Sequence, residues 1–237
     1  MTLRLLISML PLLFSMFSFA QTVTLDSLKL YSNPDLLING TRWYDYGLGY
    51  TGHQYLDKNK FTSANIQLKR HLFKDIMINY DIHQDKLVVS RKKANTYIYY
   101  YINKEDVNAF SFNDFSTQNT RNFINIKTLL PDYPPKLYEV LYDGKIKLLQ
   151  FHYKSILKET TEFSIGKYNK NSKIYLLIDQ QLIRVRNRSS ILKLFVKQKK
   201  TIKSYLRQNN LFPSKRDLPA FISLIKFCDE KGLTITQ

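Results

Sequence analysis

The sequence predicts an α+β fold, with an antiparallel β-sandwich or open barrel followed by a C-terminal helical segment. Three observations lead to this prediction. From about residue 72 to residue 186, apolar side chains alternate with polar ones in short runs, which is typical of half-buried strands. After residue 188 the apolar residues recur at helical spacing instead. The first 20 residues have the pattern of an export signal.

We expect three segments: a signal peptide at residues 1–20, a β-rich region at 21–187 and a basic helical segment at 188–237 that packs on the β-rich region. In the leader, Arg4 precedes an apolar run from Leu5 to Phe19. As a helix this run would be about 22 Å long, shorter than the ~30 Å hydrocarbon core of a bilayer. We therefore expect cleavage near Ala20, no transmembrane segment in the mature chain, and a periplasmic or extracellular location.

The first strong strand pattern covers Lys74 to Ile82 and places five side chains on one face. These are Lys74, Ile76, Ile78, Tyr80 and Ile82. The residues from His83 to Asp85 predict a short hairpin loop, because a second apolar run follows at 87–89. Further strands are predicted at 96–102, 107–112, 122–127, 137–142, 145–151, 162–167, 174–178 and 181–185.

Asp143-Gly144 predicts a two-residue hairpin turn, which would pair Tyr142 with Lys145. The same register would pair Leu141 with Ile146 and Glu139 with Leu148. The apolar residues Leu137, Leu141, Ile146 and Leu148 would then form a core face with Glu139 at its edge. The proline-rich stretch at 131–135 must be an extended loop, because its prolines lack backbone donors.

The helical segment begins with a serine N-cap at Ser189 or Ser190 and forms two short helices or one bent helix. A capping box from Ser214 to Asp217 opens the last helix, which ends before Gly232. Its apolar stripe contains Leu218, Phe221, Ile222, Ile225 and Cys228. As the only cysteine, Cys228 excludes an internal disulfide, and its place in this stripe predicts a buried thiol rather than a nucleophile.

Positive charge is concentrated near the C-terminus. The full chain carries a formal charge of +17, and removal of the leader with Arg4 leaves +16. Eleven Lys and Arg residues and no acidic residue occur between Arg184 and Arg216. Such a cluster attracts polyanions. For an exported protein, anionic lipid and acidic glycan rank above nucleic acid, and a merely solvated face is the alternative. The candidate binding residues are Lys197, Lys199, Lys200 and Lys203.

Aromatic residues crowd the glycine-containing segment from Trp43 to Tyr55. Flat rings beside polar groups suit stacking on a sugar or contact with a protein, although tyrosines also simply cover sheets. From this segment we select Trp43, Tyr44, Tyr46, His53 and Tyr55 as candidate binding residues.

Recognisable catalytic and cofactor motifs are absent from the sequence. Asp81 and His83 have a spacing found in some metal sites, but zinc needs at least three converging ligands, so we expect neither metal nor cofactor. A pair of carboxylates can still converge in space without a sequence signal. A hydrolase therefore stays an alternative function, and its candidate carboxylates are Glu139, Glu159, Glu162 and Asp179.

Two stretches resemble a pattern in uncharacterised exported β-rich proteins of the Bacteroidota. The first contains Gly52-His53-Gln54-Tyr55, with Leu56 in place of an aromatic residue, and the second runs from Tyr80-Asp81 into a hairpin. The resemblance extends to the hairpin at 138–141 and to the basic helical tail. It implies a bacterial envelope setting and assigns no activity or site.

Together these features predict an exported cell-envelope protein that is a non-enzymatic binding or assembly factor. Its partner would be an envelope protein, a glycan or an anionic lipid surface. The alternatives are a cell-wall or glycan-processing hydrolase and a purely structural envelope component.

Overall fold

The computed structural model describes residues 29–31 (backbone only), 37, 40–44, 49–114, 116–158 and 165–235. The predicted leader, Tyr46, Glu159 and Glu162 lie outside these residues. The strands are β1 (Lys29–Tyr31), β2 (Tyr50–Thr51), β3 (Thr62–Leu68), β4 (His71–Asp81), β5 (Lys86–Lys93), β6 (Thr96–Tyr101), β7 (Val107–Asn113), β8 (Thr120–Asn125), β9 (Leu137–Tyr142), β10 (Lys147–Lys158), β11 (Gly166–Ile178) and β12 (Gln181–Val185). The helices are α1 (Arg188–Leu194), α2 (Lys199–Gln208) and α3 (Leu218–Glu230), with the 3-10 turns η3 (Lys104–Asp106) and η4 (Ile126–Thr128).

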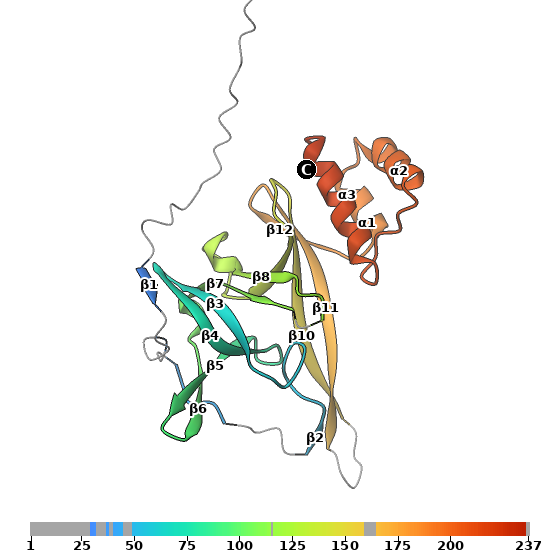
Figure 1. The fold of residues 1–237 in the computed structure, drawn as a ribbon. Coiled ribbons are helices and arrows are strands. Elements are labelled where there is room, and N and C mark those ends of the chain that lie inside the picture. Colours follow the sequence, from blue (N-terminus) through green and yellow to red (C-terminus); the bar gives the residue numbers. More distant parts are fainter. Residues whose placement is uncertain are drawn as a thin grey trace, which may run out of the picture.

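All strands belong to one large sheet, which confirms the β-rich, mainly antiparallel part of the prediction. The main path runs β12-β11-β10-β9-β8-β7-β3-β4-β5-β6, and the sheet is not closed. The short strands β1 and β2 pair in parallel with β4 and β11. The sheet twists strongly, so that the β10–β11 hairpin stands upright in the view while β7 and β8 run nearly at right angles to it (Figure 1).

The inner face of the bent sheet from β3 to β9 holds the main core. Alternate residues of successive strands point to this face because the side-chain period of a strand is two. Phe110, Phe112 and Phe123 stack with ring planes 7–12° apart, and Tyr80 packs edge-on against Phe110 and Phe123. The four rings are at most 8% exposed, so they exclude water from the space between neighbouring strands.

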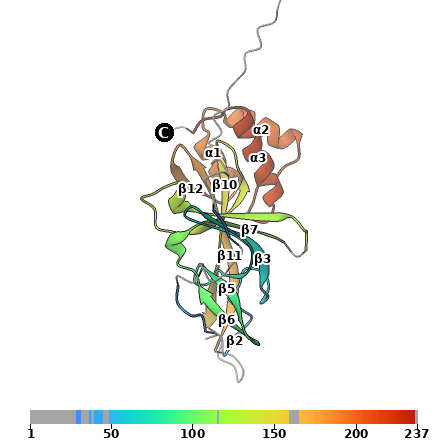
Figure 2. The same cartoon turned by 60° about the vertical axis from the view of Figure 1, so that its left-hand side comes forward.

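The long β10–β11 hairpin serves two cores. Near its open end, at the start of β10 and the end of β11, Leu148 and Leu176 face each other across the hairpin and pack against the helices. Toward its other end the same face carries His152, Lys154 and finally Ile156 opposite Tyr168, where it meets the rest of the sheet. One continuous strand pair therefore links the helices at one end of the molecule to β2 at the other (Figure 1, Figure 2).

The C-terminal segment forms two short helices and a longer one, in agreement with the sequence pattern. Asn187, not a serine, is the N-cap of α1, and Ser190 completes its capping box. Asp217, not Ser214, caps α3 by accepting the amide of Ala220. Cys228 is fully buried in the core between α3 and the hairpin, as expected for a structural thiol.

The predicted Asp143-Gly144 turn is wrong. Tyr142 pairs with Leu148 and Glu139 with Gln150, so the loop is longer than two residues. Gly144 does not have a positive φ. The reason is tertiary: the carboxylate of Asp229 on α3 accepts the amides of Lys145 and Ile146 at 3.2 and 3.0 Å, which holds the loop open against the helix.

Candidate functional site

An aromatic-lined cavity of about 220 Å³ opens at the end of the sheet remote from the helices. We call it the aromatic pocket. Its lining residues are Trp43, Tyr44, Tyr50, Gln54, Asp81, His83, Gln84, Tyr101, Ile156 and Tyr168. They come from four regions of the chain that are distant in sequence, so the pocket is a product of the tertiary fold.

The aromatic segment reaches the pocket because its backbone is fixed to three different strands. The Trp43 amide donates to Tyr99 on β6 at 2.8 Å. β2 pairs with the start of β11, opposite Gly166 and Lys167. The segment at 54–56 then runs beside the end of β4, where the Leu56 amide donates to Tyr80 at 2.9 Å. These attachments spread a short sequence around the mouth of one cavity.

Gly40 makes the first of these attachments possible. A Cβ atom at this position would lie 1.7 Å from the carbonyl oxygen of Tyr101. Only glycine allows the backbone to approach β6 this closely. The neighbouring Thr41 carbonyl accepts the Tyr101 amide at 2.8 Å, which carries the chain onward to Trp43.

Asp81 forms the floor of the aromatic pocket and is fully buried. Its Oδ1 accepts the backbone amides of His83 and Gln84, each at 2.9 Å, and its Oδ2 accepts the Tyr101 hydroxyl at 3.0 Å. Burial raises the pKa of the Asp81 carboxyl, while these hydrogen bonds oppose the rise. Burial and the adjacent Asp81 also raise the pKa of Tyr101, so this hydroxyl stays a donor to the carboxylate.

Aromatic rings form the walls of the pocket. Tyr50 and Tyr168 lie with ring centroids 5.7 Å apart, and the His83 ring meets Tyr168 edge-on at 5.5 Å. Trp43 stands edge-on to Tyr99 at 5.5 Å, which holds the indole in one orientation. Tyr44, at the mouth, is 49% exposed. A ligand entering the pocket would therefore meet ring faces before it met the polar floor.

Two histidines beside the pocket, His53 and His83, are held by hydrogen bonds that involve Lys154 and the Tyr55 amide. His83 Nδ1 lies 3.0 Å from the Lys154 carbonyl oxygen and donates to it. His53 Nδ1 accepts the Tyr55 amide at 3.2 Å, so its proton resides on Nε2. Lys154 donates to the His53 carbonyl, and burial together with Lys170 lowers the Lys154 pKa to about 8.

A buried ionic network joins the three adjacent strands β8, β9 and β10. Arg121 on β8 donates from Nε and Nη2 to the two oxygens of Glu139, each at 2.7 Å, and from Nη1 to Asp57 at 2.7 Å. His152 Nε2 lies 2.6 Å from Glu139 Oε2. Glu139 was expected at the edge of a hairpin face, but it is buried, because Arg121 and His152 satisfy both oxygens.

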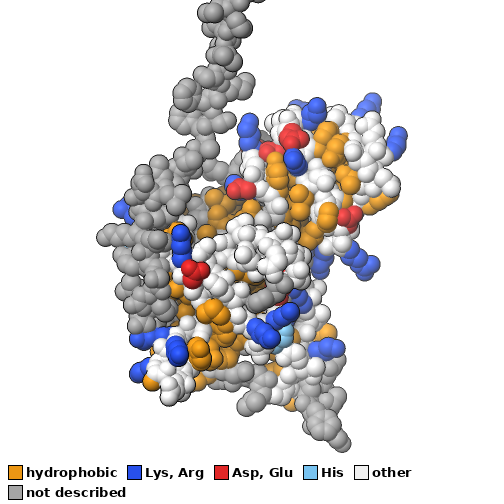
Figure 3. All heavy atoms as spheres, viewed as in Figure 1, with side chains coloured by type: hydrophobic (Ala, Val, Ile, Leu, Met, Phe, Trp, Pro, Cys, Tyr) orange, Lys and Arg blue, Asp and Glu red, His pale blue; other side chains and the backbone are white. Residues whose placement is uncertain are grey.

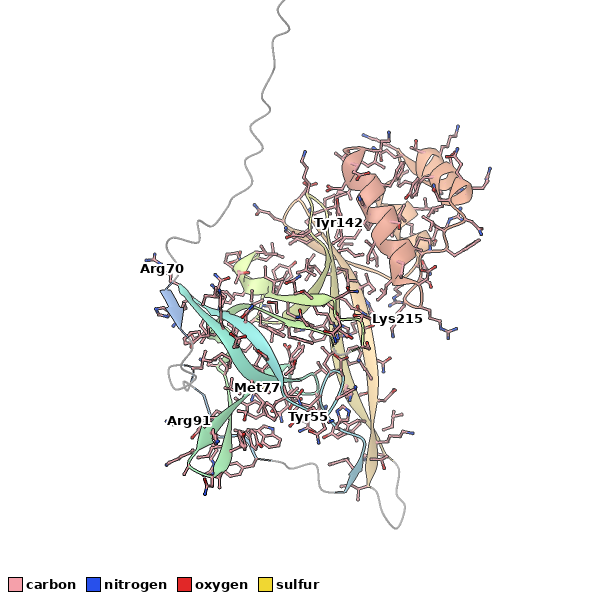
Figure 4. All side chains as sticks on the ribbon, viewed as in Figure 1. Tyr55, Arg70, Met77, Arg91, Tyr142 and Lys215 are labelled. Atoms are coloured by element: carbon pink, nitrogen blue, oxygen red, sulfur yellow. The ribbon has the colours of Figure 1, made fainter. Side chains whose placement is uncertain are left out.

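The predicted binding residues separate into two regions. Trp43 and Tyr44 line the aromatic pocket, and His53 lies beside it. Tyr55 is 2% exposed and packs in the core, with its ring centroid 6.4 Å from that of Trp43. Figure 4 labels its position in the structure. The four lysines are exposed and lie on α2 or just before it, at the other end of the molecule. They are Lys197, Lys199, Lys200 and Lys203.

Sequence reasoning did not select Gln54, Gln84 and Tyr168 for the pocket, and it considered Asp81 only as a metal ligand. A weak signal existed, since Gln54 and Asp81 lie in the two stretches that carry the family resemblance. Tyr168 gave no signal, because only the pairing of β11 with β2 brings it near Tyr50.

The described part of the chain contains no group of three or more His, Cys, Asp or Glu side chains positioned to hold a metal ion. Within the same residues, no helix has the length and apolar character needed to cross a bilayer. Comparison of the chain with protein-family models, with curated proteins and with solved structures gave no match.

Proposed function

We propose that this chain is an exported, non-enzymatic cell-envelope protein that binds a glycan through the aromatic pocket. The observation that carries the proposal is the combination of ring walls with a hydrogen-bonding floor. A sugar ring offers apolar C–H faces and a rim of hydroxyls, which match the Trp43, Tyr50 and Tyr168 rings and the polar groups of Gln54 and His83.

The volume of the pocket limits the size of the ligand that it can hold. Sites for drug-sized ligands have volumes of about 300–1,000 Å³. At about 220 Å³ the aromatic pocket has room for a single ring-sized unit rather than an extended chain. A terminal or branching sugar of an envelope polymer fits this limit better than a long segment does.

The chemistry of the floor favours binding over hydrolysis. A glycosidase needs two carboxylic groups flanking the scissile bond. Asp81 is the one carboxylate among the described lining residues, and both of its oxygens already accept protein hydrogen bonds. These hydrogen bonds suit a structural acceptor that orients Tyr101 and the 83–84 backbone. Hydrolysis of a glycan remains the second candidate function, and the experiment below distinguishes it.

Two further parts of the proposal rest on sequence and topology. Export and cleavage near Ala20 are supported by the leader pattern. An open-barrel interpretation of the sheet is supported by the unbroken strand order from β12 to β6 within one sheet. The aromatic pocket would then lie at one mouth of that barrel, where loops and strand ends can be varied without disturbing the core.

Trp43 provides a direct test, because it is the only tryptophan in the chain. The mature protein should show a saturable change in intrinsic fluorescence on titration with soluble oligosaccharide fragments of cell-envelope polymers. Tyr168→Ala should weaken binding about tenfold, the equivalent of 1.4 kcal/mol. The matched control is Tyr97→Ala, which removes a tyrosine that is 59% exposed on β6 and outside the pocket.

Two results would decide against the proposal. No saturable fluorescence change with any fragment, or an equal loss in both tyrosine variants, would exclude glycan binding at this pocket. Release of reducing ends by the wild-type protein that is abolished in Asp81→Asn would replace the binding function with hydrolysis.

A further inference from the structure

We propose that a second cavity, where the sheet meets the helices, is a binding site for a phosphate group. The cavity has a volume of about 410 Å³ and lies at the end of β12. Its lining residues are Tyr153, Ser172, Lys173, Ile174, Arg184, Val185, Arg186 and Lys215. We call it the basic pocket. Lys and Arg side chains gather in this region below the helices (Figure 3), and Lys215 is labelled there in Figure 4.

Four cations converge on the basic pocket from three segments. Lys173 lies on β11, Arg184 on β12, Arg186 just after β12, and Lys215 on the connection between α2 and α3. Arg184 pairs with Tyr175, so it shares a sheet face with Lys173 two residues away. The helical connection adds Lys215 from the side, which makes the site a product of the contact between sheet and helices.

The backbones that carry these cations are fixed. Ile174 pairs with Val185 as the last rung between β11 and β12. The Arg186 amide donates to Ser190 Oγ at 2.9 Å within the capping box of α1. The Arg188 amide donates to the Pro213 carbonyl at 3.1 Å, and Asn187 and Ser214 form a β-bridge. Lys215 is therefore held next to the exit of β12 rather than on a free loop.

Within the part of the chain that the structure describes, no acidic side chain neutralises the positive charge of the basic pocket. No carboxylate occurs among its described lining residues, and none of its four cations forms an ion pair with a described residue. Lys173 instead lies 4.9 Å from the centre of the Tyr153 ring, and Lys215 donates to the neutral amide of Asn171 at 3.4 Å. An anion entering the cavity would meet four cationic donors that no described carboxylate pairs with.

The number and type of these donors favour phosphate over carboxylate. A phosphate monoester presents three oxygens and up to two negative charges, and guanidinium groups bind it in a two-pronged geometry. Two arginines and two lysines exceed what a single carboxylate can accept, whereas the Ser172 and Tyr153 side chains add hydroxyl groups. Free phosphate and a phosphate carried on a lipid share this chemistry.

The test is a titration of the ¹⁵N-labelled mature protein at constant ionic strength, with inorganic phosphate in one arm and dihexanoyl phosphatidic acid in the other. We expect saturable shifts of the amides of Ser172, Lys173 and Arg186. The double variant Arg184→Gln/Arg186→Gln should weaken binding about tenfold. The matched control, Lys92→Gln/Lys93→Gln, removes the same charge from exposed positions on β5 and should bind as the wild type does.

The two arms of the titration distinguish free phosphate from phosphate carried on a lipid. Saturation by both probes shows that the phosphate group itself is recognised, and saturation by the short-chain lipid alone shows that the ligand is lipid-borne. Shifts that do not saturate with either probe would overturn the proposal. An equal weakening in the β5 control would do the same, because it would show that net charge rather than the basic pocket attracts the anion. Circular dichroism of both variants checks that the fold is retained.

Discussion

Glu139 on β9 binds polar side chains from both neighbouring strands, β8 and β10. Arg121 from β8 and His152 from β10 occupy its two oxygens on β9, and the side chains of all three are at most 15% exposed. Burial alone would raise the pKa of Glu139, but the hydrogen bonds and charge of Arg121 and His152 lower it to about 2. Each of the three side chains therefore depends on the others to remain buried.

We expect Glu139→Gln to lower the free energy of unfolding by about 3 kcal/mol, because it leaves the buried Arg121 charge with only part of its compensation. Urea denaturation measures the loss. The control is Glu230→Gln, which removes an exposed pair with Lys226 at 3.8 Å and should cost less than about 1 kcal/mol. Similar losses in the two variants would show that the buried network contributes no more than a surface pair does.

The network also predicts a pH dependence. Burial lowers the pKa of His152 below 6.5 in the folded protein, despite the opposing effect of Glu139. The unfolded chain therefore binds more protons below pH 6.5, so this residue destabilises the fold as the pH falls. Glu139 acts in the same direction from pH 4.5 down to about pH 2. Asp81 and Asp85, whose pKa values burial raises, act in the opposite direction.

Comparison with His152→Gln isolates the histidine from these other groups. Between pH 7 and pH 5 the wild-type protein should lose more stability than the variant, as measured by the urea midpoint at each pH. Parallel changes in the two proteins would mean that His152 takes up a proton in the folded state as readily as in the unfolded chain.

At the level of elements, one carboxylate joins the helices to the sheet. Asp229 on α3 accepts the Tyr142 hydroxyl at 3.0 Å in addition to the amides of Lys145 and Ile146. Tyr142 is labelled at the top of the hairpin, next to the helices (Figure 4). Asp229 is thus the acceptor of both loop amides, so α3 determines the shape of the β9–β10 loop.

We expect Asp229→Ala to lower the free energy of unfolding by about 1–3 kcal/mol, since it leaves the 145 and 146 amides without their acceptor. Hydrogen exchange should speed up at these two amides more than elsewhere in β9 and β10. Glu230→Ala, one residue further along α3 and exposed, is the control. Unchanged exchange at 145 and 146 in Asp229→Ala would contradict the role of this carboxylate.

The same loop shows where sequence reasoning succeeds and fails for the fold. Alternation and helical spacing are local properties, and they predicted the strands from β4 to β12 and the last helix, α3. They did not predict β1, β2 or β3, they divided β11 into two strands, and they left open whether two short helices or one bent helix precede α3. Asp143-Gly144 has a strong local preference for a tight turn, but a carboxylate 85 residues later overrides it. Similarly, the face predicted from Lys74 to Ile82 begins only at Ile76, because Asp75 has a φ of 56° and interrupts the alternation.

The aromatic pocket could be predicted only in part for the same reason. Aromatic crowding near Trp43 is visible in the sequence, because its members are close together in the chain. The floor and the far wall come from Asp81 on β4 and Tyr168 on β11. Only the strand order of the sheet brings these residues together, and that order is not encoded in any local pattern.

For the whole molecule, the important feature is the separation of the aromatic pocket from the exposed lysines of the helices. The aromatic pocket lies at the β2 end, and the helices carry the exposed lysines at the opposite end (Figure 1). We call Lys197, Lys199, Lys200 and Lys203 the basic helical face. A protein bound to an anionic surface through this face would leave the aromatic pocket directed away from that surface.

This arrangement predicts that the mature protein binds vesicles containing phosphatidylglycerol and that binding weakens as salt is added, since screening shortens the Debye length to about 8 Å at 0.15 M. Reversal of the basic helical face to four glutamates changes the formal charge by 8, from +16 to +8. Each lysine near an anionic surface contributes about 1 kcal/mol, so binding should fall at least about a hundredfold.

A matched variant separates this face from net charge. Lys60, Lys74, Lys92 and Lys93 are exposed on the sheet or the loop before it, and their reversal to glutamate gives the same +8. Vesicle co-sedimentation should show a much smaller loss for this variant, because only cations close to the lipid act within a Debye length. Equal losses would mean that the protein binds anionic surfaces through its total charge, without a preferred orientation of the aromatic pocket.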